Sequence, residues 1–326
     1  MKKTNPLVKT SYLTAMLLAI LSVMASCVSY TPLNTAVEPT KPTVEGVLPG
    51  VFTVAEGRQV RFSQGNLQYQ ASTNTWRFAE HQWDIIGEKN SNISPSYDGW
   101  IDLFGWATSG YHDTLDDLNI NYQPWSNSTK PLTKRKNNNL VRVSGYGPYN
   151  NMSTTHLTGS CANYDWGVYN AISNGGNQAG LWRTLLFDEW IYLINHRVTH
   201  SGVRFVKAQV NNVNGMILLP DDWDVSYFKL NRINKFWGSY KYNKITSKEW
   251  VKLETHGAVF LPAAGYRKKT SVKHLGSRGG YWSASPGAYN TAWSFSYYGR
   301  GLLFSDNLSP CIGRSLRLVT SVSNEE

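Results

Sequence analysis

The chain has 326 residues, which is enough for one large domain or for a domain with substantial insertions. Its 32 lysines and arginines outnumber its 22 acidic residues and give a net charge of +10, while three cysteines are too few for a disulfide scaffold. The densest basic stretch, Lys130–Lys136, is typical of a solvated loop. For an exported protein its partner would be anionic lipid or an acidic glycan rather than nucleic acid.

The first 27 residues predict export and attachment to a lipid. Three lysines precede a largely apolar run, Tyr12–Ala25, and the small Ser26 stands before Cys27. This run is shorter than the ~20 residues of a transmembrane helix. Residues 24–27, Met-Ala-Ser-Cys, resemble the lipobox of bacterial lipoproteins, which implies cleavage after residue 26 and acylation of Cys27 with palmitate-type chains. The alternative is a plain signal peptide with an incidental cysteine.

The remainder divides into a tether, one domain and a tail. Cleavage of the signal segment 1–26 would remove three lysines and no acid, so the net charge would fall to +7. Residues 27–49 contain four prolines and little apolar periodicity, and we expect a flexible tether between membrane and domain. Residues 50–321 show no composition break and no fixed-period repeat, which predicts a single domain with insertions. Residues 322–326 would be a disordered tail.

Short strands are the commonest predicted elements, because glycines and asparagines recur every few residues between aromatic ones. Three N-terminal segments alternate polar and apolar side chains: residues 59–63, 66–69 and 75–78. Residues 71–74, between the last two, predict a hairpin turn. Apolar runs at 216–220 and 258–262 end in proline and predict buried strands.

Two segments predict helices. Thr184 is the N-cap candidate of the first, since acidic residues follow in the first turn. The apolar face of this helix comprises Leu186, Trp190, Leu193 and Ile194. The second helix begins at Thr246 or Ser247 and stops at Gly257, a residue type that commonly ends helices.

The C-terminal third predicts consecutive antiparallel strands of one sheet. Residues 292–297 alternate between small residues and aromatic ones, which gives the strand two different faces. Near the end of the chain, Leu316 and Leu318 would face one way while Arg317 faces the other.

Three blocks carry a family resemblance: Leu181–Trp190, residues 279–284 (Gly-Gly-Tyr-Trp-Ser-Ala) and residues 313–319 (Gly-Arg-Ser-Leu-Arg-Leu-Val). Together they resemble the Fibrobacter succinogenes major paralogous domain family, and the wider chain looks like uncharacterised lipoproteins of gut and oral anaerobes. More remotely, the pattern is similar to the C-type-lectin-like and formylglycine-generating-enzyme superfamily. This resemblance implies an α+β, C-type-lectin-like fold with antiparallel sheets, two main helices and long irregular loops. It does not settle an activity.

Sequence motifs for catalysis are incomplete. His196 and His200 stand four residues apart, but Arg197 occupies the position at which a zinc protease needs its glutamate base. We therefore interpret them as exposed histidines at a helix end. No serine-hydrolase, P-loop or dinucleotide fingerprint occurs, and no carboxylate pair for glycoside hydrolysis stands out. The sequence thus predicts a protein that is not an enzyme.

No cofactor is expected, and calcium has no motif in its support. Asp221, Asp222 and Asp224 offer oxygen ligands, but an acidic turn after a strand is the more ordinary interpretation. The aspartates between 113 and 117 carry the same ambiguity. Calcium-dependent sugar binding in C-type lectins uses Glu-Pro-Asn or Gln-Pro-Asp with Trp-Asn-Asp. Residues 123–125 read Gln-Pro-Trp instead, and no Trp-Asn-Asp occurs.

Two cysteines remain if Cys27 carries lipid. An oxidising compartment permits a disulfide between Cys161 and Cys311, and two buried thiols are an equal alternative. The formylglycine-generating enzyme uses a close cysteine pair or a copper site near its C-terminal part. Only Cys311 stands there in this chain, so oxidase chemistry of that kind is not expected.

Aromatic residues in irregular loops are the remaining functional signal, because exposed Trp and Tyr rings bind the faces of sugars or peptide side chains. The candidates for ligand contact are Trp100, Tyr111, Trp125, Tyr289, Tyr297 and Tyr298. Core packing is the alternative for each, and we prefer it for Trp106, Trp190 and Trp282, whose neighbours are apolar or small. Thr114 lies in a short Asp-Thr-Leu pattern that makes it a candidate for O-glycosylation.

These observations predict a lipid-anchored outer-membrane protein of the bacterial cell envelope that binds a glycan or a surface protein without catalysis. A polysaccharide-processing enzyme with an unrecognised site and a structural envelope component are the alternatives. Whether the protein faces the periplasm or the cell surface stays open. Surface-export signals of this bacterial group place acidic residues directly after the lipidated cysteine, and residues 28–31 contain none.

Overall fold

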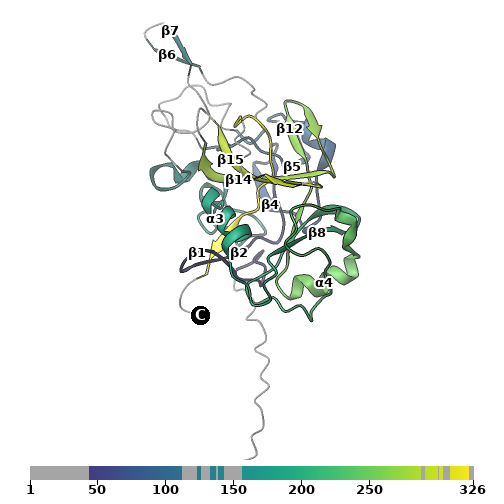
Figure 1. Ribbon diagram of the computed structural model, residues 1–326. Helices are drawn as coiled ribbons and strands as arrows, with labels where there is room; N and C mark the ends of the chain where they lie inside the picture. Colours follow the sequence, from purple (N-terminus) through teal and green to yellow (C-terminus); the bar gives the residue numbers. More distant parts are fainter. Residues whose placement is uncertain are drawn as a thin grey trace, which may run out of the picture. The chain divides into compact units, whose positions relative to one another are not determined.

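The computed structural model describes residues 44–111, 123–125, 133–136, 139–142, 156–287, 291–299, 301–303 and 309–322. Residues 41–326 cluster as one compact unit. It is a mixed α+β structure, as the sequence predicts, with few helices and several short, mostly antiparallel sheets (Figure 1). The predicted signal segment, Cys27, Thr114 and Tyr289 lie outside the described residues, as does the tail after residue 322.

The strands are short throughout. They are β1 (Phe52–Ala55), β2 (Arg58–Phe62), β3 (Leu67–Gln70), β4 (Thr75–Phe78), β5 (Trp100–Ile101), β6 (Thr133–Lys136), β7 (Asn139–Arg142), β8 (Phe205–Val210), β9 (Val213–Leu218), β10 (Lys244–Ile245), β11 (Val259–Pro262), β12 (Tyr266–Lys268), β13 (Ser271–Lys273), β14 (Arg278–Pro286), β15 (Ala292–Tyr298), β16 (Gly301–Leu303) and β17 (Val319–Ser321). The helical elements are η2 (Gly87–Ser91), η4 (Gly159–Tyr164), α2 (Trp166–Tyr169), α3 (Phe187–Ile191), η5 (Tyr192–His196), η6 (Tyr240–Tyr242) and α4 (Ser247–Thr255). Among these strands, β10 pairs with β8 in parallel and the other strand neighbours are antiparallel.

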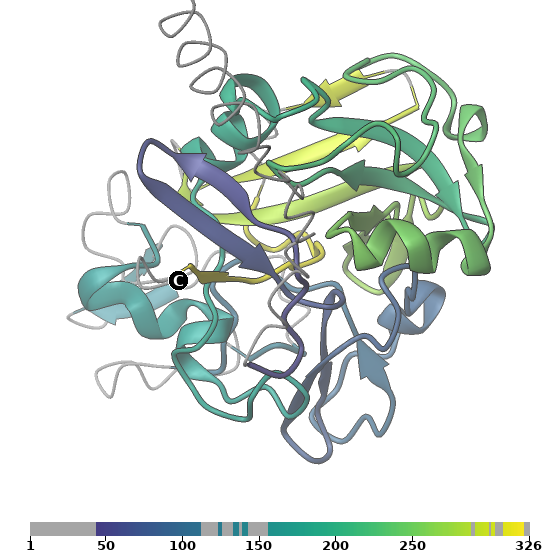
Figure 2. The same ribbon diagram turned by 90° about the horizontal axis from the view of Figure 1, so that it is seen from below.

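The predicted N-terminal hairpin is confirmed. Strands β3 and β4 pair antiparallel across the turn at residues 71–74, and β5 adds to the other edge of β3. Strands β1 and β2 form a second hairpin, and β17 pairs with β2 at its free edge (Figure 2). The beginning and the end of the domain therefore share one sheet, which lets the last strand close the fold.

The central sheet has the strand order β10-β8-β9-β11 and contains both predicted proline-ended runs. Helix α4 covers one of its faces, where Trp250 and Leu253 pack against Ile217 and Phe260 (Figure 2). The predicted bounds of this helix are confirmed. Its N-cap Thr246 accepts a 3.2 Å hydrogen bond from the Glu249 backbone N–H, and the Glu249 carboxylate accepts one in return from the Thr246 N–H.

The other predicted helix is real but begins two residues later than expected. Thr184 is a buried residue before the helix, and the N-cap position belongs to Leu186. Two side chains satisfy the first N–H groups instead: the Glu189 carboxylate accepts from Leu186 N, and the Ser285 hydroxyl accepts from Phe187 N. The Ser285 hydroxyl, from a distant strand, takes the role of a local N-cap side chain. The spacing of residues along the sequence cannot reveal such a long-range contact.

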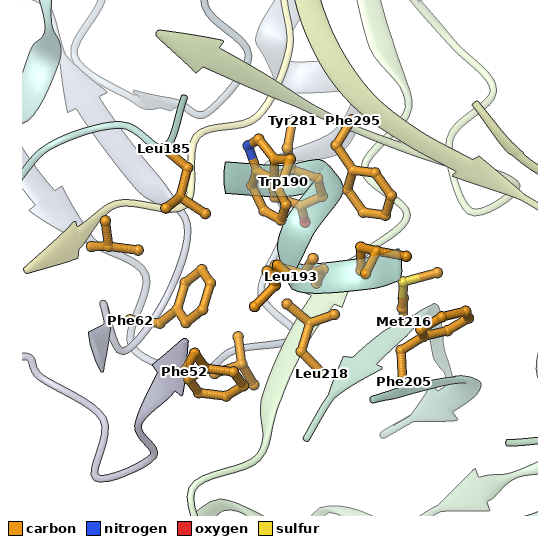
Figure 3. Close-up of a cluster of buried hydrophobic side chains, with 14 of the residues drawn as sticks. Phe52, Phe62, Leu185, Trp190, Leu193, Phe205, Met216, Leu218, Tyr281 and Phe295 are labelled. Carbon is orange, nitrogen blue, oxygen red and sulfur yellow. The ribbon is translucent and has the colours of Figure 1, made fainter. Parts of the chain in front are cut away.

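The continuous helix α3–η5 carries the central aromatic core. Trp190 and Leu193 point among aromatic and aliphatic side chains from β1, β2, β9 and β15 (Figure 3). The Trp190 ring stacks on Phe295 with 5.1 Å between centroids. Trp106 and Trp282 are buried in a neighbouring cluster, so the sequence assignment of these three tryptophans to the core is confirmed. Leu186, expected on the same helical face, is half-buried and packs against that neighbouring cluster.

One prediction about the C-terminal third is wrong. Strands β14, β15 and β16 form one sheet, but residues 313–319 do not continue it. This segment makes isolated bridges through residues 313–315 and then pairs with β2 as β17. The reason is its side chains: Arg314 and Arg317 are buried, and the Arg317 guanidinium donates to the carbonyl oxygens of Ser63 and Phe260. Arg317 therefore lies in the interior, as Leu316 and Leu318 do.

Candidate functional site

The aromatic residues singled out from the sequence do not form one exposed surface in the described part of the chain. Trp100 is half-buried and lies under the Arg77 guanidinium, 3.9 Å from its ring centroid. Tyr111 and Trp125 are half-buried against the core cluster that contains Trp106, and Tyr111 packs edge-on against Tyr164.

Tyr297 requires a correction. Its side chain is 0% exposed, and its hydroxyl donates to the carbonyl oxygen of Leu261. Burial raises the pKa of this phenol well above its ordinary value. A ring that is enclosed on all sides cannot serve as a binding surface, so Tyr297 belongs to the core. Its neighbour Tyr298 is half-buried at the end of β15.

A surface that the sequence did not single out has the properties expected of a ligand site. Side chains from the segment between β9 and β10, together with Val203 before β8, form an apolar groove of about 350 Å³. The groove is lined by Val203, Trp223, Val225, Phe228, Lys229, Leu230 and Ile233. This volume lies near the lower end of the ~300–1,000 Å³ range of small-molecule sites. We call these seven residues the apolar groove.

Stacked rings support the groove from below. Trp223 is buried and packs edge-on against Tyr227, with 5.5 Å between ring centroids. Tyr227 in turn stacks on His256 at the end of helix α4, with the two planes within 4° of parallel. The helix that covers the central sheet thus also holds the floor of the groove.

Exposed aromatic residues continue from the groove along the chain. Phe236 is 42% exposed, Trp237 is 68% exposed and Tyr242 is 49% exposed. One face of Phe236 stacks on Phe205 of β8 at 5.7 Å, whereas Trp237 projects most of its side chain into solvent. We call residues 225–242 the aromatic loop.

Side-chain amides hold the backbone of the aromatic loop in place. Asn234 accepts hydrogen bonds from the Arg204 and Phe205 N–H groups and donates to the carbonyl oxygen of Gly202 at 2.7 Å. Asn243 accepts from Asn231 N and donates back to the Asn231 carbonyl. The loop is therefore shaped before any ligand arrives, which lowers the entropy lost on binding.

A buried lysine adds a third attachment. The Lys207 ammonium donates to the carbonyl oxygens of Phe236 and Tyr298, and burial lowers the pKa of Lys207 to about 8. Gly238 N also donates to Gly299 O at 3.1 Å. The aromatic loop is thereby tied to the turn between β15 and β16.

In the aspartate motif, Asp221 and Asp224 are held in hydrogen bonds of the fold. His196 and His200 are exposed, as expected. Arg197, between them, is buried and forms a 2.9 Å ion pair with Asp221. Asp221 also accepts hydrogen bonds from the backbone and hydroxyl of Thr53, so its oxygens are already occupied. Asp224 accepts from Ser226 N in a local turn.

Other buried titratable groups take part in hydrogen bonds of the fold. Burial raises the pKa of Asp102 and Asp165 to about 6, but Asp165 caps α2 through Gly167 N and accepts from Thr184 N. The His156 ring lies 3.0 Å from the Ser285 hydroxyl, which is already engaged by the first N–H of α3. Within the described ranges no group of three or more His, Cys, Asp or Glu residues is arranged to hold a metal ion.

The two remaining cysteines lie in different environments. Cys161 is buried in the cluster around Trp106, and Cys311 is half-buried in the segment before residues 313–315. They are not bonded to each other in the structure. A disulfide between Cys161 and Cys311 in an oxidising compartment stays a prediction.

Comparison with known proteins leaves this chain without an assigned relative: no family model, no curated protein and no solved structure matches it. Of the helices in the described part, none has the length and hydropathy that a membrane span requires. The aromatic loop and the apolar groove themselves are therefore the features from which a function can be inferred.

Sequence reasoning missed this surface although a signal was present. Apolar residues in the stretch 225–237 follow neither a two-residue nor a 3.6-residue period, and polar residues separate them. Apolar side chains in such an irregular stretch cannot all face one core. Some of them must therefore remain exposed, which is the property that marks a binding surface.

Proposed function

We propose that this protein binds a glycan without chemical turnover, through the aromatic loop and the apolar groove. The single observation that carries the proposal is the set of exposed rings at Phe236, Trp237 and Tyr242 on a loop whose backbone is already held in place. Flat rings bind the C–H faces of sugars, and their polar edges leave hydroxyl groups solvated.

The groove adds concavity to the exposed rings. Its lining is apolar apart from Lys229, so it offers both an apolar wall and one charged donor. A few polar groups in a mostly apolar pocket are typical of sites that orient a small ligand. A sugar residue of a longer chain fits this description, with the neighbouring residues of the chain lying along the aromatic loop.

The proposed cellular setting follows from the sequence. Residues 24–27 resemble a lipobox, and the tether over residues 27–49 would place the domain a short distance from an outer membrane. The resemblance to the major paralogous domain family and to C-type-lectin-like proteins supports the proposal that the fold is a C-type-lectin-like one. A surface protein is the alternative ligand, because exposed aromatic residues also anchor protein interfaces.

The test is a glycan array probed with the full chain in detergent, together with a pull-down of envelope proteins by the same material. We expect retention of one class of glycan and loss of that retention in Trp237→Ala. Capture of a defined envelope protein with no glycan bound would favour the alternative ligand. Release of reducing sugar from any bound polysaccharide would contradict the proposal, because it would show turnover.

A further inference from the structure

We infer that the ligand of the aromatic loop is an anionic polysaccharide, one that carries carboxylate or sulfate groups. This inference rests on the proposed function, since it names the ligand class of the same surface. It comes from the charges that accompany the exposed rings.

The aromatic loop and strand β10 carry only positive charge. Residues 225–245 contain five basic residues and no acidic one. The basic residues are Lys229, Arg232, Lys235, Lys241 and Lys244, and each is exposed. Five like charges within 21 residues produce a local positive potential that concentrates a polyanion at this surface.

The charges alternate with the rings. Lys229 lines the apolar groove, and Lys235 directly precedes Phe236 and Trp237. The Arg232 guanidinium lies 5.2 Å from the centroid of the Tyr242 ring. A polymer that placed a sugar face on one of the rings would therefore have a cation within reach of its acidic substituent.

The backbone around these cations is held in an uncommon conformation. Arg232 has a φ of +56° and Asn234 a φ of +52°, in the left-handed region that a side chain such as that of arginine rarely adopts. The hydrogen bonds of Asn231 and Asn234 on either side maintain this conformation. The two asparagines thus restrict the backbone that carries the Arg232 side chain.

The acidic residues that directly precede the loop in the sequence do not cancel this potential. Asp221 is paired with the buried Arg197, and the Asp224 carboxylate accepts the N–H of Ser226. Asp222 is exposed and lies before the loop, outside the basic stretch. The net charge from residue 221 to residue 245 therefore remains positive, at +2.

An anionic bilayer would also attract this charge, but the shape of the surface favours a polymer. A segment that lies on a bilayer presents an outward apolar face that enters the boundary between headgroups and acyl chains. Here seven residues line a concave groove, and the neighbouring loop holds Asn231, Asn234 and Asn243 in hydrogen bonds to the backbone. A polysaccharide residue can enter a groove of this size, whereas the surface of a bilayer cannot.

The experiment measures binding of the full chain, in a neutral detergent, to immobilised polygalacturonate and chondroitin sulfate, with neutral dextran of similar length beside them. We expect binding to the two acidic polymers, and a fall of about tenfold when salt is raised from about 50 to about 500 mM. The variant Lys229→Gln/Lys235→Gln/Lys241→Gln should bind about tenfold more weakly. The matched control, Lys248→Gln/Lys252→Gln/Lys268→Gln, removes three other exposed lysines and should bind as the unaltered chain does.

Each other outcome overturns the inference in a different way. Binding to a neutral glycan that depends on Trp237 and not on the three lysines would defeat the anionic ligand and leave the proposed function intact. Binding to phosphatidylglycerol vesicles without binding to either acidic polymer would assign the surface to a membrane. Equal losses in the two triple variants would show attraction by overall charge, and binding to no glycan of either kind would defeat the inference and the proposed function together.

Discussion

The Lys207 ammonium group lies 2.7 Å from the carbonyl oxygen of Tyr298. It also donates to the carbonyl oxygen of Phe236, so one buried cation joins strand β8, the aromatic loop and the turn after β15. Its partners in the described part of the chain are backbone carbonyl oxygens and include no carboxylate. The position of the proposed binding loop therefore depends on a buried residue that is not part of the exposed surface of the loop.

Replacing Lys207 by methionine tests this attachment, because methionine keeps an apolar stem and removes the donors. We expect the Lys207→Met chain to lose about 1–3 kcal/mol of stability, since buried carbonyl oxygens lose their donor. Amide hydrogen exchange should quicken across residues 234–242. Lys241→Met, an exposed lysine of the same loop, is the control, and identical exchange in the two variants would contradict the attachment.

The same lysine predicts a dependence of stability on pH. Burial lowers the folded-state pKa of Lys207 to about 8, below the ordinary value of 10.5. Between these values the unfolded chain binds this proton and the folded chain releases it, so the contribution of Lys207 to the free energy of unfolding rises with pH. Urea unfolding at several pH values across this window should show that rise.

Several tyrosines also titrate at alkaline pH. The contribution of Lys207 is therefore measured as the difference in free energy of unfolding between the unaltered chain and the Lys207→Met chain at each pH. Burial raises the pKa of Tyr240 and Tyr281, and these groups change stability in the opposite direction above their unfolded values. Subtracting the profile of Lys207→Met removes their contribution. If this difference in free energy of unfolding stays flat or falls between pH 8 and 10.5, the lowered pKa of Lys207 is ruled out.

Trp237 is predicted to matter for binding and not for folding. Its side chain is 68% exposed, so Trp237→Ala should leave the melting temperature unchanged and weaken ligand binding by about tenfold. Trp250→Ala is expected to do the reverse, with a loss of about 3–5 kcal/mol of stability, because Trp250 is buried between α4 and the central sheet. Calorimetry and binding to the retained glycan measure the two effects.

Tyr169 provides the matched surface control for Trp237. It is also an exposed aromatic residue, and it packs edge-on against Tyr111, one of the residues first singled out from the sequence. Tyr169→Ala should bind the ligand normally. If binding is lost there and kept in Trp237→Ala, the ligand site lies in the Tyr111 region and not in the aromatic loop.

The ion pair between Arg197 and Asp221 should be a large determinant of stability. The Arg197 side chain is fully buried, and burial lowers its pKa to about 10 although the neighbouring carboxylate opposes that shift. Asp221→Asn leaves the guanidinium without its charged partner, and we expect a loss of about 3–5 kcal/mol in urea unfolding. The double variant Arg197→Met/Asp221→Asn should lose less than the two single losses combined, and strict additivity would contradict the coupling.

The lipid anchor is tested at Cys27. Cells fed an alkyne analogue of palmitate should label the full chain, and Cys27→Ala should carry no label and appear in the soluble fraction. Cys311→Ala is the control and should label normally. A labelled Cys27→Ala protein would place the acyl group elsewhere, and an unlabelled native chain would remove the anchor from the proposal.

Local patterns predicted local structure well. The turn over residues 71–74 and the helix that begins after Thr246 are decided by neighbours in the chain, and both lie where the sequence placed them. The helix near residue 187 was displaced because its first N–H groups are satisfied by Glu189 and Ser285, and Ser285 comes from a strand almost 100 residues away. The predicted start of this helix was wrong because a hydroxyl distant in the sequence accepts a hydrogen bond that a neighbouring side chain was expected to accept.

By itself, the sequence determined the turn over residues 71–74, the helix that begins after Thr246, the burial of Trp106, Trp190 and Trp282, and the signal-like start with its candidate acylation site. Those properties follow from side-chain period, residue size and capping, which act over a few residues. Only the tertiary structure decided that Tyr297 is enclosed while Trp237 is exposed, and that β17 joins β2. Burial depends on which distant segments pack against a side chain, and that information is absent from the spacing of residues along the chain.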